Sequence, residues 1–70
     1  MYKKVKIDTQ EIQLDQFLKW ANLAGSGGEA KTLIQAGEVN VNGKIEDRRS
    51  RKLKPGDKVI ISNQVKLEVS

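Results

Sequence analysis

The 70 residues amount to 7.8 kDa, enough for one small domain, because domains most often contain roughly 100–150 residues. The sequence contains neither cysteine nor histidine, which excludes disulfides, haem ligation, zinc sites of the Cys/His type and thiol or imidazole catalysis. A net charge of +4 and a pI of about 9.6 favour a polyanionic partner. We therefore expect a single domain over residues 1–70 without a metal or cofactor.

Two elements are predicted at the start of the chain. Residues 2–7 alternate valine and isoleucine with lysine, which predicts a strand at the edge of a sheet. Apolar residues such as Leu14 and Phe17 then recur at helical spacing and predict an amphipathic helix over residues 13–24. Trp20 widens the apolar stripe of this helix, so we expect it to pack at the edge of the core rather than to stack on a base.

A second helix is predicted after a glycine-rich break. Ser26 and Glu29 have the spacing of a capping box, in which the serine oxygen accepts from the Glu29 amide and the carboxylate accepts in return. The helix should therefore begin near Gly27, and Gly37 is the expected left-handed residue at its end. Because the connection is short, we expect the two helices to pack as a pair.

The second half of the sequence has the pattern of short strands. Asn42-Gly43 between Val39–Val41 and Lys44–Ile45 predicts a hairpin with a primed two-residue turn. A strict two-residue turn places Ile45 on the wrong face, whereas a bulge after Gly43 would return it to the core. The sequence leaves these two registers open.

The remaining elements complete the predicted fold. Pro55 and Gly56 suit the centre of a type II turn, and they precede predicted strands over residues 58–62 and 65–69. The resulting order is β-α-α-β-β-β-β. We therefore predict the α+β class, with a helix pair packed on a small, mostly antiparallel sheet. The longest aliphatic run has three residues, so neither a signal peptide nor a membrane span is expected.

The positive charge is concentrated in residues 48–54, which contain Arg48, Arg49, Arg51, Lys52 and Lys54 and no acid. Removing these five from the 13 basic residues leaves eight against nine acidic ones, a net charge of −1. Glu46 and Asp47 precede the run, and we expect them not to cancel it. Clustered charge favours a polyanion, because each neutralised phosphate releases a counterion. A solvated loop kept basic for solubility is the alternative.

Gly27 and Gly28 in the first turn of the second helix indicate a second contact. Glycine there lowers helix stability by roughly 1 kcal/mol per residue relative to alanine. Glycine leaves the backbone amides at the positive end of the helix dipole unobstructed by a Cβ, which favours the binding of an anion. Lys31, one turn later, could bind the same phosphate. The alternative is that the glycines only permit the bend between the helices.

Other chemistry has little support in the sequence. Asn42-Gly43 is foremost a turn, although Lys44 beside it could extend the basic surface. Three aromatic residues are too few for an aromatic stacking sheet, and no carboxylate pair, nucleophile–base set or Walker loop is present. We therefore expect no enzyme activity.

Four stretches together resemble a known family, the S-four domain, an RNA-binding module also called the alpha-L motif. They are Leu14-Asp15-Gln16-Phe17-Leu18, Ser26-Gly27-Gly28-Glu29-Ala30-Lys31-x-Leu33-Ile34, Gly37-x-Val39-x-Val41-Asn42-Gly43 and Lys54-Pro55-Gly56-Asp57-x-Val59. The third and the Pro-Gly-Asp of the fourth are the most specific. The Ser-Gly-Gly-Glu-Ala-Lys segment is similar to the short stand-alone bacterial branch (YaaA/YbcJ-like).

The resemblance implies a helix pair and a hairpin that hold structured RNA through phosphates. Together with the basic run, it assigns RNA binding to Gly27, Gly28, Lys31, Asn42, Lys44, Arg48, Arg49, Arg51 and Lys52. We accordingly expect a monomeric, cytoplasmic protein that binds ribosomal RNA, or transfer RNA, and thereby the ribosome or an assembly intermediate. The alternatives are a ribosome-associated protein-docking module and a KH-like RNA binder, since Gly25-Ser26-Gly27-Gly28 fits GxxG.

Overall fold

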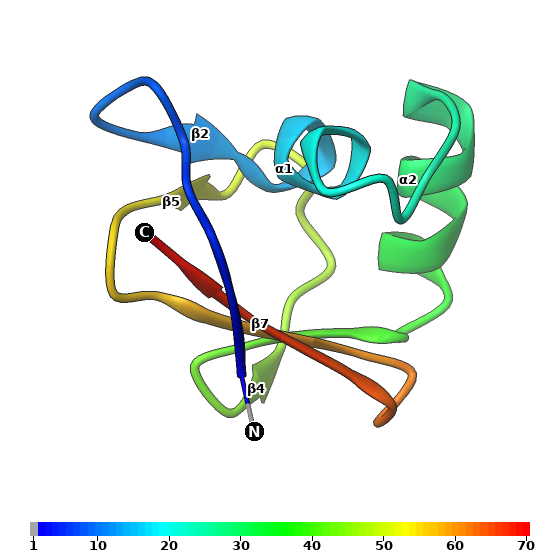
Figure 1. Ribbon diagram of the computed structural model, residues 1–70. Helices are drawn as coiled ribbons and strands as arrows, with labels where there is room; N and C mark the ends of the chain where they lie inside the picture. The colour runs from blue at the N-terminus through cyan, green and yellow to red at the C-terminus, as the bar shows by residue number, and fades with distance from the viewer. Residues whose placement is uncertain (1) are drawn as a thin grey trace.

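The computed structural model describes residues 2–70, whose core lies between a layer of helices and a sheet (Figure 1). In chain order their elements are β1 Lys3–Val5, β2 Ile12–Gln13, α1 Leu14–Trp20, α2 Gly27–Gln35, β3 Val39–Val41, β4 Lys44–Ile45, β5 Lys52–Leu53, β6 Lys58–Ile61 and β7 Val65–Val69. Within this part of the chain, no helix has the length and apolar character of a membrane span.

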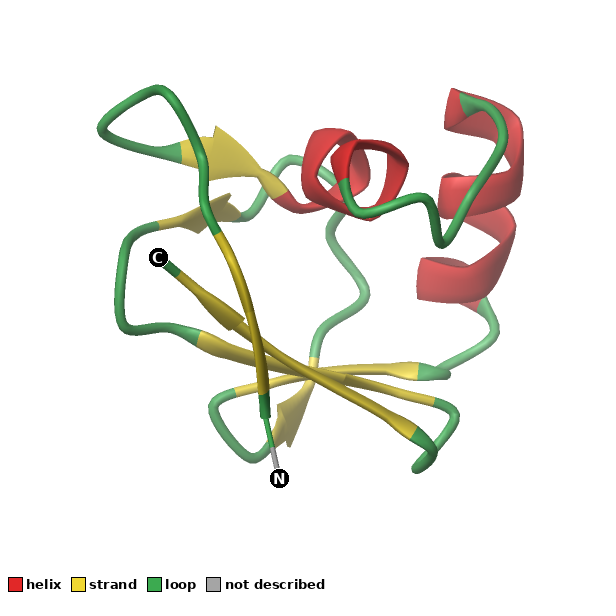
Figure 2. Cartoon of the chain, viewed as in Figure 1, coloured by secondary structure: helices red, strands yellow, loops and turns green. Residues whose placement is uncertain are grey.

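The larger sheet has the strand order β1-β7-β6-β3-β4, and both helices lie on the same side of it (Figure 2). β1 runs parallel to β7 at one edge, and the other pairs are antiparallel. The predicted α+β class and mostly antiparallel sheet are therefore confirmed. The predicted element order was incomplete, because β2 and β5 form a separate two-stranded sheet. Strands of two residues show no alternation that a sequence pattern could reveal.

The core combines the apolar faces of the helices and of the sheet. Val41 is opposite Val59 and Val59 is opposite Leu67, so three adjacent strands each direct one apolar residue toward the helices. The fully buried side chains are Leu14, Phe17, Leu18, Ala30, Ile34, Val39, Leu53 and Val59. Their burial removes apolar surface from water and holds the helix pair on the sheet.

Helix α1 ends four residues earlier than predicted. Asn22 has a left-handed backbone with φ of 61°. Its amide donates to the Lys19 carbonyl over 3.0 Å, and the Leu23 amide donates to the Leu18 carbonyl over 2.8 Å. These two bonds are a Schellman motif with asparagine in place of the usual glycine. Apolar spacing continued to residue 24, so the periodicity did not reveal this end.

Trp20 does not widen the buried stripe as predicted. Its side chain is 52% exposed. The indole Nε1–H donates to the Lys6 carbonyl over 2.8 Å, which ties α1 to the chain that follows β1. Because its only donor is satisfied by the protein, the ring has a structural role at the surface rather than in the core.

Helix α2 begins and ends where the sequence predicted. The Ser26 hydroxyl accepts from the Glu29 amide over 3.2 Å, whereas the Glu29 carboxylate accepts from the Gly25 amide over 2.9 Å instead of from Ser26. The reciprocal half of the capping box is therefore displaced by one residue. At the other end Gly37 has φ of 76°, and its amide donates to the Ile34 carbonyl over 3.2 Å.

The hairpin between β3 and β4 has the strict two-residue turn and no bulge, which decides between the two registers that the sequence left open. Asn42 and Gly43 have φ of 53° and 91°, as a primed turn requires, and Val41 pairs directly with Lys44. Ile45 is consequently on the outer face and 66% exposed. The predicted turn before β6 is confirmed, with Gly56 at φ of 100°.

Candidate nucleic-acid interface

The basic segment, residues 48–54, is fastened to the N-terminus of α1. The N-cap residue, Gln13, makes no side-chain hydrogen bond to the helix. Instead the Leu14 amide donates to the Arg51 carbonyl over 2.7 Å, and the Asp15 amide donates to the Arg49 carbonyl over 3.1 Å. The first amides of a helix otherwise lack partners within it. The basic segment therefore supplies the cap that the sequence of α1 lacks.

The end of the basic segment is fixed by β5. Gln13 is opposite Lys52, and Ile12 is opposite Leu53, whose side chain is fully buried. Burial of Leu53 turns Lys52 outward, because successive residues of a strand face opposite sides. The Lys52 Nζ lies 3.4 Å from Glu11 Oε1, and both side chains are largely exposed. Such an exposed pair contributes little to stability.

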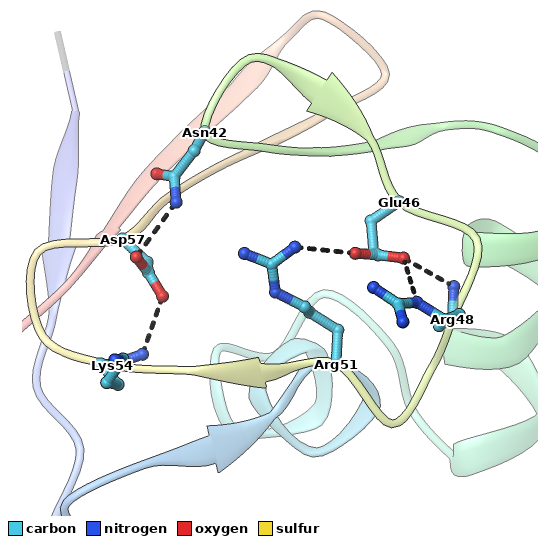
Figure 3. A network of polar contacts seen from close by, with 6 residues as sticks. All are labelled: Asn42, Glu46, Arg48, Arg51, Lys54 and Asp57. Carbon is cyan, nitrogen blue, oxygen red and sulfur yellow. Dashed lines mark hydrogen bonds and ion pairs between the residues drawn. The ribbon is translucent and has the colours of Figure 1, made fainter.

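The start of the basic segment is organised by Glu46, which is only 7% exposed (Figure 3). Its Oε2 accepts from the Arg48 amide over 3.1 Å and from Arg48 Nε over 3.2 Å, and its Oε1 accepts from Arg51 Nη1 over 2.9 Å. Hydrogen bonds from Arg48 and Arg51 outweigh burial and lower the pKa of Glu46 from 4.5 to about 2. Glu46 thus binds two arginines of the basic segment, while Glu46 and Asp47 together remain fewer than its five basic residues.

The arginines of the segment differ in how much charge they present. The Arg51 side chain is 35% exposed and that of Arg48 is 71% exposed. Arg49, Lys54 and Lys44 are exposed and form no ion pair within residues 2–70. The outward positive charge therefore comes mainly from Arg48, Arg49 and the neighbouring lysines, with Arg51 beneath them.

Asn42 is engaged within the protein. Its Nδ2 donates to Asp57 Oδ1 over 3.0 Å, and its Oδ1 accepts from the Lys58 amide over 2.9 Å. Asp57 also accepts from the Lys54 amide over 2.9 Å (Figure 3). These bonds join the tip of the hairpin to the end of the basic segment. Both polar atoms of Asn42 therefore bind within the protein, where they link the hairpin to the Lys54–Asp57 turn.

Gly27 and Gly28 at the start of α2 are not required by the backbone. Neither has a positive φ, and a Cβ added at Gly27 would meet nothing within 4 Å, while one at Gly28 would lie 3.8 Å from Ser26 Oγ. The interpretation that these glycines permit the bend is therefore not supported. Their amides have no hydrogen-bond partner within the described residues, and Lys31 is exposed. The nearby Glu29 carboxylate is directed to Gly25.

The two predicted contacts connect to opposite ends of α1. The basic segment caps its N-terminus, whereas the chain between residues 21 and 26 joins its C-terminus to the start of α2 (Figure 1). Seven helical residues extend over about 10 Å. The sequence predicted the basic segment and the start of α2 as two contacts, and in the structure helix α1 lies between them along the chain path.

Sequence reasoning missed Glu46 as a functional residue. Arg48 and Arg51 follow it by two and five residues, a spacing that belongs to no regular structure. The only signal in the sequence was the position of Glu46, an acidic residue between a predicted strand and the basic run. Its burial depends on the turn from Arg48 to Arg51, whose amide–carbonyl hydrogen bond measures 3.2 Å.

The chain is similar to known proteins over most of its length. A family model described as "S4 domain" matches residues 5–70, nearly the whole chain. The chain belongs to the S4 domain family. This S4 domain is 48% identical over 61 residues to a Bacillus subtilis protein named probable ribosome maturation protein RlbA, covering 87% of this chain and 86% of that one. It is also 39% identical over 56 residues to the small ribosomal subunit protein uS4 of Karelsulcia muelleri, covering 80% of this chain and 29% of that protein.

Solved structures show the same fold in larger proteins. A pseudouridylate synthase superposes with a TM-score of 0.65 at 23% identity, over 73% of this S4 domain and 22% of the synthase. The ribosomal protein S4e of Thermoplasma acidophilum superposes with a TM-score of 0.58 at 20% identity, over 79% of this chain and 29% of that one. At these identities the likeness concerns the fold alone, and this S4 domain spans less than a third of either protein.

Proposed function

We propose that this S4 domain binds structured RNA without catalysis, with ribosomal RNA as the favoured partner. The observation that carries the proposal is the basic segment, which is built into the fold while Arg48 and Arg49 remain exposed. A loop kept basic only for solubility would not need its carbonyls to cap a helix. The similarity to proteins named for ribosome maturation and for the small ribosomal subunit supports a ribosomal RNA. It also supports a cytoplasmic location.

The contacts fall into two groups in this proposal. Lys44, Arg48, Arg49 and Lys52 bind phosphates near the N-terminus of α1, because guanidinium and ammonium groups match phosphate oxygens. The free amides of Gly27 and Gly28, with Lys31, bind a further phosphate at the start of α2. Asn42 and Arg51 support these contacts through their hydrogen bonds within the protein. A transfer RNA could supply the same phosphates, and phosphate contacts alone do not read sequence.

The test is the salt dependence of binding. We expect the wild-type monomer to bind a folded ribosomal RNA fragment with a log–log salt slope that corresponds to roughly three to six phosphates. The R48Q/R49Q variant should lose affinity and flatten the slope, since it removes two exposed cations and keeps the Glu46–Arg51 pair. The matched control is K4Q/K66Q, which removes the same charge from exposed lysines of β1 and β7.

The outcomes separate the alternatives. Absence of RNA binding by the wild type at low salt, or equal effects of both double variants, would contradict the proposal. Recovery of one protein partner at high salt without RNA would favour the docking module instead. Crosslinking in cell extract followed by sequencing of the attached RNA identifies which RNA is bound. A KH-like protein is no longer an alternative, because the chain is an S4 domain.

A further inference from the structure

Glu46 is held in place by the sheet. It follows β4 directly, and its amide donates to the Val39 carbonyl over 3.0 Å. Its carboxylate is buried and is bound only by groups of the basic segment, namely Arg48 and Arg51. The sheet thus fixes a negative charge, and that charge in turn fixes two arginine side chains.

The bond to Arg48 leaves the far end of its side chain available. Glu46 accepts from the amide and from Nε of Arg48, and the terminal Nη groups of that arginine form no hydrogen bond within the described residues. The side chain is 71% exposed, so those Nη groups are directed to solvent. Arg51 differs, because it gives Nη1 to Glu46 and is half as exposed. A carboxylate bound at Nε therefore orients Arg48 and leaves its two terminal Nη groups available to bind a phosphate.

We propose that Glu46 is a positioning residue for RNA, which holds Arg48 in one orientation so that its terminal Nη groups meet a phosphate. This inference rests on the proposed function. An arginine side chain that no other group holds in the free protein loses rotamer freedom when it binds RNA. The entropy cost of this ordering weakens binding. Because Glu46 has already ordered Arg48 in the free protein, less freedom is lost when RNA binds.

Two effects of Glu46 on RNA affinity have opposite signs. Its negative charge repels phosphates, whereas its hydrogen bonds orient an arginine toward them. The E46Q variant removes the charge and one of the two acceptor oxygens, so that Arg48 and Arg51 can no longer both be held. A matched variant must therefore report the charge effect alone. E11Q serves this purpose, because Glu11 belongs to the same surface and pairs with Lys52 at 3.4 Å, while both of these side chains are largely exposed. Both variants raise the net charge by one.

The main experiment compares these variants by fluorescence anisotropy with one ribosomal RNA fragment. E11Q should bind as tightly as the wild type or more tightly, and E46Q should bind about three- to tenfold more weakly than E11Q. At high salt the gain of E11Q should disappear, whereas the deficit of E46Q should persist, because orientation is not screened. Binding of E46Q at least as tight as that of E11Q would overturn the inference and leave the proposed function intact.

A double-mutant cycle separates positioning from a general effect on the loop. R48Q should weaken binding much less in the E46Q background than in the wild type, since Arg48 is no longer oriented there. R49Q should have the same effect in both backgrounds, because the Arg49 side chain makes no contact with Glu46. If R48Q and R49Q both weaken binding less in the E46Q background, and by the same factor, the loop has become disordered. That result would overturn the positioning role.

R48K keeps the inference testable if E46Q does not fold. Lysine retains the charge, and the Glu46–Arg51 pair remains. Its single nitrogen turns away from RNA when it contacts Glu46, so we expect severalfold weaker binding than the wild type. Wild-type affinity of R48K would overturn the inference. If the wild type itself binds no RNA, the proposed function fails first, and the two failures are therefore distinguishable.

Discussion

The amide of Leu14 donates to the carbonyl of Arg51 over 2.7 Å, so the first turn of α1 is completed by a residue 37 positions later in the chain. Helix α1 and the basic segment are therefore parts of one structural unit. The Asp15 amide extends the connection through its 3.1 Å bond to the Arg49 carbonyl. A change that frees the basic segment should also uncap the helix.

The first prediction concerns hydrogen exchange at this junction. The amides of Leu14 and Asp15 should exchange slowly, although first-turn amides ordinarily lack a backbone partner. In E46Q, which lacks the charge and can no longer accept from both Arg48 and Arg51, both amides should exchange faster while the Ile34 amide in α2 stays protected. Exchange resolved by NMR measures this. Fast exchange of Leu14 in the wild type would contradict the cap, and unchanged exchange in E46Q would show that Glu46 does not support it.

The second prediction is a dependence of stability on acid. Arg48 and Arg51 lower the pKa of Glu46 from 4.5 to about 2. A carboxyl with a lowered folded-state pKa stabilises the fold above its unfolded value, and this contribution is lost as the pH falls from about 4.5 to about 2. The unfolding free energy of the wild type should fall through this range by on the order of 2–3 kcal/mol more than that of E46Q. Urea unfolding at several pH values measures the difference, and E11Q should behave as the wild type does.

The third prediction tests the glycines of α2. G27A and G28A should each raise the unfolding free energy by up to about 1 kcal/mol, because alanine favours the helix. The added Cβ meets nothing within 4 Å at Gly27 and makes only an ordinary contact with Ser26 Oγ, at 3.8 Å, at Gly28. Both should weaken RNA binding, since the Cβ obstructs approach to the amides. G37A is the control and should lower stability by about 1 kcal/mol, because φ there is +76°. A gain in stability without loss of RNA binding would remove the second phosphate contact from the proposal.

Much of this fold could be predicted because its signals are local. The cap at Ser26, the left-handed Gly37 and the Asn42-Gly43 turn each depend on a few adjacent residues, and all three are present. The early end of α1 was missed because Asn22 adopts a conformation that glycine more often takes. The organisation of the basic segment depends on contacts with residues far away in sequence, such as Leu14 and Val39, which no local pattern contains.

Ile45 shows how a sound rule can mislead. A bulge would be needed only if Ile45 faced the core, yet β4 is a two-residue edge strand in direct register with β3. Its side chain is 66% exposed, because the strict turn is compatible with an isoleucine on the surface. The turn geometry therefore determined the register, and the apolar pattern did not.

The fourth prediction tests that register. I45T should change the unfolding free energy by less than about 0.5 kcal/mol, because an exposed side chain is replaced by another β-branched residue. I34A is the control, and loss of this fully buried side chain should cost about 2–5 kcal/mol. Urea unfolding of both variants gives the comparison. A loss of more than about 1 kcal/mol in I45T would mean that Ile45 packs against the core and that the hairpin contains the bulge after all.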